Sequence, residues 1–323
     1  MASNVPIVTT QHSEAGALAS PLRRTPAAVA VARVLLDHHA TMCAAVSPRC
    51  LPDPQQLHQL RVAMRHSRSL LRAYREVLGR DLARHFQAQW RWLAAATSRL
   101  RDIDVLYTAV LEASADYTAL DSRSRTRLAT FLQAERARDA ERLQRRLAGA
   151  RYARLRRRWP RTLTEVITRT APDAPTIGAA AAAAIGKALA RLRRDIATVA
   201  TDSSAGAVHE LRKQCKRLRY LVEPCASLYP PAPIAAVQSA LKQVQTLLGK
   251  RCDRHAQLVL LRGHLWRRAK GRPALRTVLH SANRALHAGL AERDVETLAN
   301  ALAAFDDGRH HAALDALFGM AEL

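Results

Sequence analysis

HQLRVAMRHSRSLLRAYR, residues 58–75, is the stretch that decides the fold. Successive residues of a helix are turned by about 100°, so the cationic side chains of this stretch fall within one arc of roughly 80°. These cationic residues are His58, Arg61, Arg65, Arg68 and Arg72. The opposite side carries Leu60, Ala63, Met64, Ser67, Leu70, Leu71 and Tyr74. We therefore predict an amphipathic helix that buries its apolar side and presents a row of guanidinium groups.

The same pattern returns 151 residues later without a gap. The segment His58-Gln-Leu-Arg61 corresponds to His209-Glu-Leu-Arg212. The further matches are Arg65 with Lys216, Arg68 with Arg219, Arg91 with Lys242, Arg99 with Lys250, and Asp102 with Asp253. We infer that a helical unit has been duplicated, which predicts two basic helices in symmetric positions.

Composition favours helices throughout. Hydrophobic residues make up 48% of the 323, only 14 residues are aromatic, and Ala and Leu dominate, a mixture typical of helices and not of strands. No convincing alternating strand pattern occurs. The sequence therefore predicts an all-α fold of two pseudo-symmetric antiparallel helical bundles that arise from the internal duplication.

The chain divides at changes of composition. We expect a disordered leader at residues 1–22, a first helical repeat at 23–159, a linker at 160–175, a second repeat at 176–290, and a helical tail at 291–323. Asp53-Pro54 is a helix start signal, and Pro160 is interpreted as the start of the hinge. The expected helices span residues 26–46, 54–79, 81–98, 100–112, 122–159, 176–199, 209–228, 234–248, 252–269 and 272–287.

The charge of the chain is strongly one-sided. It has 51 Lys and Arg against 27 Asp and Glu, a formal net charge of +24, and 45 of the basic residues are Arg. Codon bias can account for Arg in place of Lys, but it does not account for the surplus of cations over acids. The surplus favours a polyanionic partner, which is nucleic acid, an anionic membrane or a phosphate polymer.

Cysteine spacing and hydropathy indicate the compartment. The five cysteines include no Cys-x-x-Cys pair, which fits a reducing cytoplasm. Residues 1–22 lack a signal-peptide pattern, and no run of eighteen apolar residues occurs. We therefore expect a soluble cytoplasmic protein without membrane association, and the sequence leaves its oligomeric state open.

Both halves resemble the CHAD domain, the conserved histidine α-helical domain. The family has a His-x-x-Arg-x-x-x-Arg/Lys-x-x-Arg helix in each of two repeats, then a helix that ends in a basic, Asp-containing turn. Here these stretches are HQLRVAMRHSR at 58–68 and HELRKQCKRLR at 209–219, then LRDIDVL at 100–106 and LGKRCDR at 248–254. The resemblance covers residues 25–290. It implies two helical bundles around a basic groove that binds inorganic polyphosphate, in proteins found with bacterial polyphosphate granules.

Some CHAD proteins also carry a triphosphatase domain of the CYTH type, which has a Glu-x-Glu-x-Lys motif. This chain contains no such motif. The resemblance therefore implies a stand-alone, non-catalytic binding module in the cytoplasm, associated with polyphosphate granules.

A linear polyphosphate exposes only charged oxygens, so its complement is a row of fixed cations. From His58 to Arg68 the predicted row is roughly 15 Å long, at 1.5 Å per residue. The expected polyphosphate-binding residues are His58, Arg61, Arg65, Arg68, Arg72, Arg91 and Arg99 in the first half, and His209, Arg212, Lys213, Lys216, Arg219, Lys242 and Lys250 in the second. Glu223 stands in the place of Arg72, and we expect it to pair with Arg219.

Other chemistries have less support. Asp102 and Asp253 are interpreted as residues that orient a neighbouring Arg or Lys or cap a helix, so we expect no metal site and no cofactor. No Gly-rich phosphate loop or nucleophile motif occurs, which argues against a polyphosphate- or nucleotide-processing enzyme. Nucleic acid is the alternative partner, although only Tyr220 lies near a basic arc and could stack on a base. The charged segment 122–158 could also coat granules as a scaffold.

Overall fold

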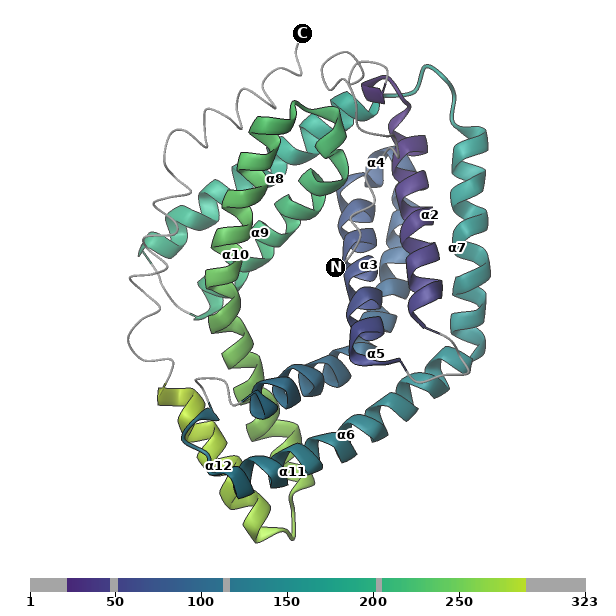
Figure 1. Cartoon of the computed structure of the whole chain (residues 1–323). Helices are drawn as coiled ribbons and strands as arrows, with labels where there is room; N and C mark the ends of the chain where they lie inside the picture. Colours follow the sequence, from purple (N-terminus) through teal and green to yellow (C-terminus); the bar gives the residue numbers. More distant parts are fainter. Residues whose placement is uncertain (1–21, 47–51, 113–116, 202–204, 289–323) are drawn as a thin grey trace.

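The computed structural model describes residues 22–46, 52–112, 117–201 and 205–288, and within them it confirms the all-α class (Figure 1). The first half contains α2 (Ala27–Ala45), α3 (Pro54–Ala73), α4 (Arg75–Leu78), α5 (Arg80–Leu111), α6 (Ser122–Ala148) and α7 (Ala150–Arg169). The second half contains α8 (Ile177–Thr201), α9 (Ala205–Cys225), α10 (Pro231–Leu260), α11 (Trp266–Arg268) and α12 (Pro273–Ala288). The expected leader, up to residue 21, and the expected helical tail at 291–323 lie outside the described residues.

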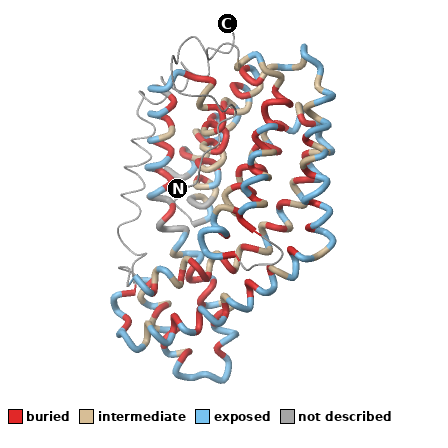
Figure 2. Tube along the Cα trace, turned by 45° about the vertical axis from the view of Figure 1, so that its right-hand side comes forward, coloured by how far each residue is buried: buried red, intermediate tan, exposed pale blue. Residues whose placement is uncertain are grey.

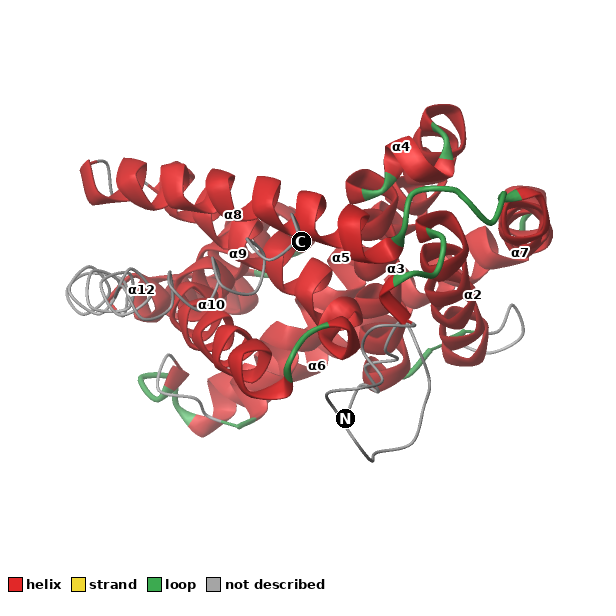
Figure 3. Ribbon diagram, turned by 90° about the horizontal axis from the view of Figure 1, so that it is seen from above, coloured by secondary structure: helices red, strands yellow, loops and turns green. Residues whose placement is uncertain are grey.

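The helices form two upright layers above a lower layer. In the first half α2 packs between α3 and α7, and α5 packs on α3. In the second half α9 packs between α8 and α10 (Figures 1 and 3). α5 and α10 both run down into the lower layer, where they meet α6 and α12 (Figure 1).

Two apolar cores hold these layers together. The larger core takes residues from α2 to α10, and it includes the fully buried pair Trp90 of α5 and Trp159 of α7, whose ring centroids lie 5.6 Å apart. The smaller core lies in the lower layer, where Leu106 of α5, Leu258 of α10 and Leu279 of α12 are buried together. Buried residues line the inward faces of the helices in Figure 2. Each core takes residues from both halves of the chain, so the halves share their cores.

The two halves begin side by side. The Ala27 amide donates to the Pro175 carbonyl, and the Ile177 amide donates to the Thr25 carbonyl, each at 2.8 Å. These reciprocal bonds form the isolated β-bridge between Pro26 and Thr176, and the described residues contain no strand beyond it. The starts of α2 and α8 are therefore tied together by backbone.

The helix boundaries follow the 151-residue spacing. The first residues of α3, α5 and α6 are 54, 80 and 122, and α9, α10 and α12 begin 151 residues later at 205, 231 and 273. The duplication itself stays a prediction, and these matching starts support it.

Asp53 starts α3 as expected. The Gln56 amide donates to Asp53 Oδ1 at 2.7 Å, and the Asp53 amide donates to Gln56 Oε1 at 3.0 Å. This reciprocal capping box, with Pro54 at the first helical position, satisfies backbone donors at the helix end. It fixes where the basic row on α3 begins.

Several expected boundaries differ from the structure. The helix expected at 54–79 breaks at Tyr74, and α5 starts directly after Gly79, whose φ of 94° suits glycine. Residues 81–98 and 100–112 form the single helix α5, and residues 234–248 and 252–260 form the single helix α10. Asp81 lies inside the first turn of α5 and is not its N-cap.

Pro160 does not end a helix. The expected helix at 122–159 breaks instead at Gly149, and α7 continues through Pro160 to Arg169. A proline inside a helix costs about 3 kcal/mol. Apolar residues at helical spacing on both sides of it, including Trp159 and Leu163, are fully buried, so burial of this face offsets the lost backbone bond.

Candidate polyanion-binding site

The apolar side of α3 orients its basic row. The residues expected to be buried are all buried, namely Leu60, Ala63, Met64, Ser67, Leu70, Leu71 and Tyr74. On the other side Arg61, Arg65 and Arg68 are half-buried, while His58 and Arg72 are exposed. The predicted amphipathic arrangement of this helix is therefore observed.

α3 and α9 cross in direct contact. The Tyr74 hydroxyl and the Cys225 sulfur, both buried, lie 3.5 Å apart at the crossing. The rings of His66 and Tyr220 lie 4.4 Å apart, and His66 Nε2 lies 3.8 Å from a carboxylate oxygen of Glu223. These contacts join the C-terminal parts of the two helices, so the two basic helices meet there.

Two arginines flank Tyr220 at this crossing. The guanidinium carbons of Arg65 and Arg219 lie 5.6 and 5.3 Å from its ring centroid, within the range of cation–π attraction. Tyr220 is 3% exposed, so its ring is unavailable to a base. Glu223 Oε1 lies 3.0 Å from Arg219 Nε, the pairing expected from the sequence.

Like charges from four helices gather around Arg72. Partial burial lowers the pKa of Arg72, and neighbouring guanidinium groups lower it further. In decreasing order of effect these neighbours are Arg217 of α9, Arg68 of α3, Arg91 of α5 and Arg191 of α8. We call the five residues Arg68, Arg72, Arg91, Arg191 and Arg217 the arginine cluster.

Few carboxylates neutralise the charge of the arginine cluster. Within the described residues, carboxylates pair with neither Arg68, Arg72, Arg91 nor Arg191. Arg217 Nη1 donates to Gln214 Oε1 at 2.8 Å and lies 3.9 Å from Glu210 Oε1. The neighbouring Lys213 also pairs with Glu210. Uncompensated cations this close repel one another and attract an anion.

A second basic region lies at the start of α3. Partial burial lowers the pKa of His58, and Arg101, Arg65 and Arg61 lower it further. Arg61 is held in place because its Nη1 donates to Thr97 Oγ1 at 2.8 Å. His58 is therefore neutral at neutral pH and lies among three cations, where a bound phosphate would favour its protonated form.

Asp102 and Asp253 approach each other between α5 and α10. Burial raises the pKa of Asp102, the neighbouring Arg61 and Arg101 lower it, and the negative charge of Asp253 raises it again. Asp253 accepts a hydrogen bond from Arg212 Nη2 at 3.1 Å. This contact fits the interpretation of Asp253 as a residue that orients an arginine. The described residues contain no group of three or more His, Cys, Asp or Glu placed to hold a metal ion.

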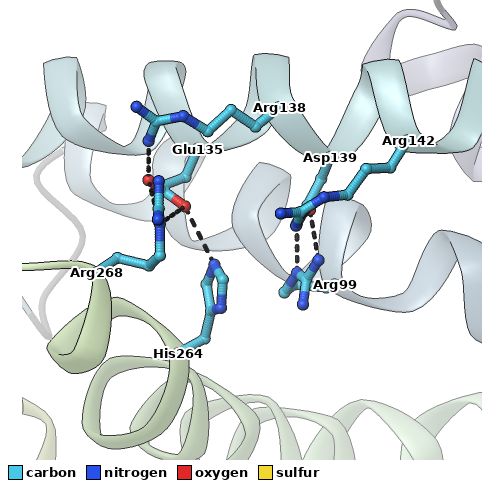
Figure 4. A network of polar contacts seen from close by, with 7 residues as sticks. All are labelled: Arg99, Glu135, Arg138, Asp139, Arg142, His264 and Arg268. Atoms are coloured by element: carbon cyan, nitrogen blue, oxygen red, sulfur yellow. Dashed lines mark hydrogen bonds and ion pairs between the residues drawn. The ribbon is translucent and has the colours of Figure 1, made fainter.

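Arg99 is engaged in a separate network (Figure 4). Its Nε and Nη2 donate to the two carboxylate oxygens of buried Asp139, each at 2.5 Å, and Arg142 donates to the same carboxylate at 2.8 Å. Burial alone would raise the pKa of Asp139, but these two arginines hold it below its ordinary value. Arg99 is therefore paired with Asp139 of α6, and it is not among the arginines that act on Arg72.

The same network links α6 to the end of the second half. Glu135, 2% exposed, accepts from Arg268 Nε at 3.1 Å, pairs with Arg138, and lies 3.1 Å from His264 Nε2 (Figure 4). His264 lies in a π-helical turn, Leu261–Leu265, that follows α10. These contacts hold the lower layer together.

The remaining expected residues are placed as follows. Lys242 is exposed on α10, and Lys216 is half-buried on α9. The side chains of His209 and Lys250 lie outside the described part of the structure. The structure thus brings together two groups from the expected set, His58 with Arg61 and Arg65, and Arg72 with Arg68 and Arg91. The binding role of every expected residue stays a prediction.

Three basic residues of the two regions were not expected from the sequence, namely Arg101, Arg191 and Arg217. Arg217 directly follows Lys216, so the basic arc on α9 could have been drawn wider. Arg191 follows the Ala-rich start of α8, and only the packing of α8 on α9 brings it to Arg72. Arg101 directly precedes Asp102, but its proximity to His58 depends on how α5 crosses α3.

Fold and site together define an all-helical protein in which two crossing basic helices assemble cations from four helices. The chain belongs to the CHAD domain family, whose model matches residues 27–262. The structure is similar to the crystal structure of the CHAD domain from the plant Ricinus communis, with 20% sequence identity, a TM-score of 0.65, and coverage of 93% of this chain and 96% of that one. PptA from Streptomyces chartreusis is also similar, with 14% identity, a TM-score of 0.63, and coverage of 86% and 99%. At these identities the two structures support the fold alone, and no curated protein matches the sequence.

Among the described helices, none is both long enough and apolar enough to cross a bilayer.

Proposed function

We propose that this protein binds inorganic polyphosphate without cleaving it, through the arginine cluster and the basic region around His58. The observation that carries the proposal is the arrangement of the arginine cluster, in which arginines from four helices surround Arg72 and four of the five members have no carboxylate partner among the described residues. In the free protein these charges repel one another, and a chain of phosphates removes the repulsion while accepting hydrogen bonds from each guanidinium fork. Membership of the CHAD family supports this choice of polyanion.

Polyphosphate suits this surface better than nucleic acid does. A base needs an exposed aromatic or planar group on which to stack. The aromatic ring at the crossing, Tyr220, is buried between Arg65 and Arg219 and has no free face. The crossing therefore offers contacts to phosphate oxygens and no exposed aromatic ring on which a base could stack. In a cell we expect the protein in the cytoplasm, at polyphosphate granules.

A double variant tests the proposal. Arg72→Gln together with Arg217→Gln removes two cations of the arginine cluster and keeps good helix formers in place. We expect at least about a tenfold loss of affinity for long-chain polyphosphate at physiological salt, since each lost charge-assisted bond is worth about 1.5–3 kcal/mol. The measurement is fluorescence anisotropy with labelled polyphosphate, with single-stranded DNA as the competing ligand.

Three outcomes contradict the proposal. Unchanged polyphosphate affinity in the double variant means that the arginine cluster is not the site. Equal affinity of the wild type for polyphosphate and single-stranded DNA at physiological salt removes the preference claimed here. Release of orthophosphate during incubation with polyphosphate and Mg²⁺ shows that the protein is an enzyme.

A further inference from the structure

α7 carries a second basic surface on the side that faces away from α2. Its buried residues are Tyr152, Leu155, Trp159 and Leu163, and they pack toward α2. On the opposite side of the helix Arg154, Arg157, Arg158 and Arg161 are all exposed. At helical spacing these four share an arc of roughly 100° over about two turns. We call them the α7 row.

The arginines of the α7 row form no ion pairs. Within the described part of the chain, none of the four takes part in one. Glu165, the one acid in the sequence of α7, lies on the same side of the helix four residues after Arg161, so one acid stands against four cations there. On the neighbouring α6, by contrast, Arg138 and Arg142 are paired with Glu135 and Asp139. Four unpaired cations on one helix face have the charge pattern of a polyanion-binding surface.

The α7 row is fixed in position and separate from the arginine cluster. Arg151 anchors the start of α7 on α5, because its guanidinium carbon lies 4.3 Å from the Trp92 ring centroid and its Nε donates to Gln89 Oε1 at 3.0 Å. α2 lies between α7 and α3 (Figure 1). With packed helix axes about 8–10 Å apart, α7 and α3 are separated by about 16–20 Å. A short anion bound at the arginine cluster therefore does not reach the α7 row.

We propose that the α7 row is a second polyphosphate-binding surface, so that one protein molecule holds two segments of phosphate polymer and can link separate chains. This inference rests on the proposed function and extends it from binding to cross-linking. A lipid surface fits less well, since basic helices that lie on membranes also insert apolar side chains. Among the described residues, the exposed large hydrophobic side chains are Leu111, Val259 and Trp266, and none of them is on α7.

The experiment compares two variants of equal charge. The α7 variant carries Arg154→Gln, Arg157→Gln, Arg158→Gln and Arg161→Gln. The control variant carries Arg24→Gln, Arg33→Gln, Arg127→Gln and Arg284→Gln, four exposed arginines that are scattered over the surface. Light scattering measures assemblies formed with long-chain polyphosphate. Fluorescence anisotropy measures the affinity for a polyphosphate that is too short to reach from the arginine cluster to the α7 row. Circular dichroism confirms that each variant is folded.

We expect the α7 variant to bind the short polyphosphate with an affinity within about twofold of that of the wild type. Its scattering intensity with long-chain polyphosphate should be lower by a factor of about five or more, because linking separate chains requires two sites on one molecule. The control variant should scatter as the wild type does. Undiminished scattering by the α7 variant overturns the inference, and so does an equal loss in the control, which would make net charge the cause. Loss of binding to anionic lipid vesicles without loss of scattering assigns the α7 row to membranes instead.

The proposed function fails separately from this inference. If the variant Arg72→Gln with Arg217→Gln keeps full affinity for the short polyphosphate, the arginine cluster is not the primary site, whatever the α7 variant does. If that double variant loses short-chain binding while the α7 variant still scatters fully, the primary site stands and the second surface is rejected.

Discussion

Replacing Arg72 by Gln should stabilise the free protein and weaken its binding of polyphosphate. Four arginines lower the pKa of Arg72 by their charge. Two exposed like charges about 8 Å apart in physiological salt repel by about 0.2 kcal/mol in water. Four such neighbours give about 0.8 kcal/mol, so we expect the free energy of unfolding to rise by about 0.5–1 kcal/mol.

The same substitution removes one charge-assisted contact with phosphate. At this exposed position we expect a loss of about 1–2 kcal/mol, or about 5–30-fold in affinity. The slope of log affinity against log salt should become shallower by about 0.7, the contribution of one neutralised phosphate in a flexible polyanion. Urea denaturation without ligand gives the stability, and anisotropy across a salt series gives the affinity and its slope.

Arg33→Gln is the matched control. Arg33 is exposed on α2, and it makes no ion pair in the described part of the chain. Its replacement should change stability by less than about 0.5 kcal/mol and affinity by less than about twofold. The reasoning is refuted if Arg72→Gln destabilises the protein while leaving affinity unchanged, because Arg72 would then be a structural residue.

Three further predictions concern buried groups. Glu223→Gln should tighten polyphosphate binding about two- to fivefold, measured by anisotropy, because it frees Arg219 from its ion pair. Since burial raises the pKa of Glu223, wild-type binding should also tighten as the pH is lowered and Glu223 becomes protonated, and the Gln variant should lose that part of the pH dependence. Burial lowers the pKa of His38 from 6.5 to about 4, so the unfolded chain takes up this proton at a higher pH than the folded protein does. Urea denaturation should therefore show that stability decreases as the pH is lowered from about 6.5 to about 4, and the decrease should be less steep in His38→Gln. Asp139→Asn should cost about 1–3 kcal/mol in the same assay without weakening polyphosphate binding, since the arginines that it releases, Arg99 and Arg142, lie outside the arginine cluster.

Helical periodicity was sufficient to predict which face of α3 is buried. The apolar arc of α3 is buried residue for residue, and the Asp53 cap lies where the sequence indicated it. Local signals failed where packing outweighs them. Pro160 is a strong helix breaker, yet the buried face of α7 runs past it, and nothing within a few residues of Pro160 reveals that Leu163 is covered by the larger core.

The partners of each cation could not be predicted from spacing. Arg99 matches Lys250 in the repeat and was expected to bind the ligand, but Asp139, forty residues away on α6, accepts hydrogen bonds from two of its guanidinium nitrogens, Nε and Nη2. Arg191, by contrast, was not expected in the site, but it lies near Arg72 together with cations from three other helices. A repeat indicates which positions correspond, whereas the crossing of helices decides which charges are free.

The contacts at the starts and at the crossing of the two halves have a consequence for the kinetics of binding. The bridge between Pro26 and Thr176 ties the starts of α2 and α8, and the buried pair Tyr74 and Cys225 ties α3 to α9. The helices that carry the arginine cluster are thus restrained from moving apart to relieve their repulsion. The ordering of these charges is completed during folding, so an arriving anion meets a preorganised surface. Association should then be fast and steered by charge, with little change in helix content when the complex forms.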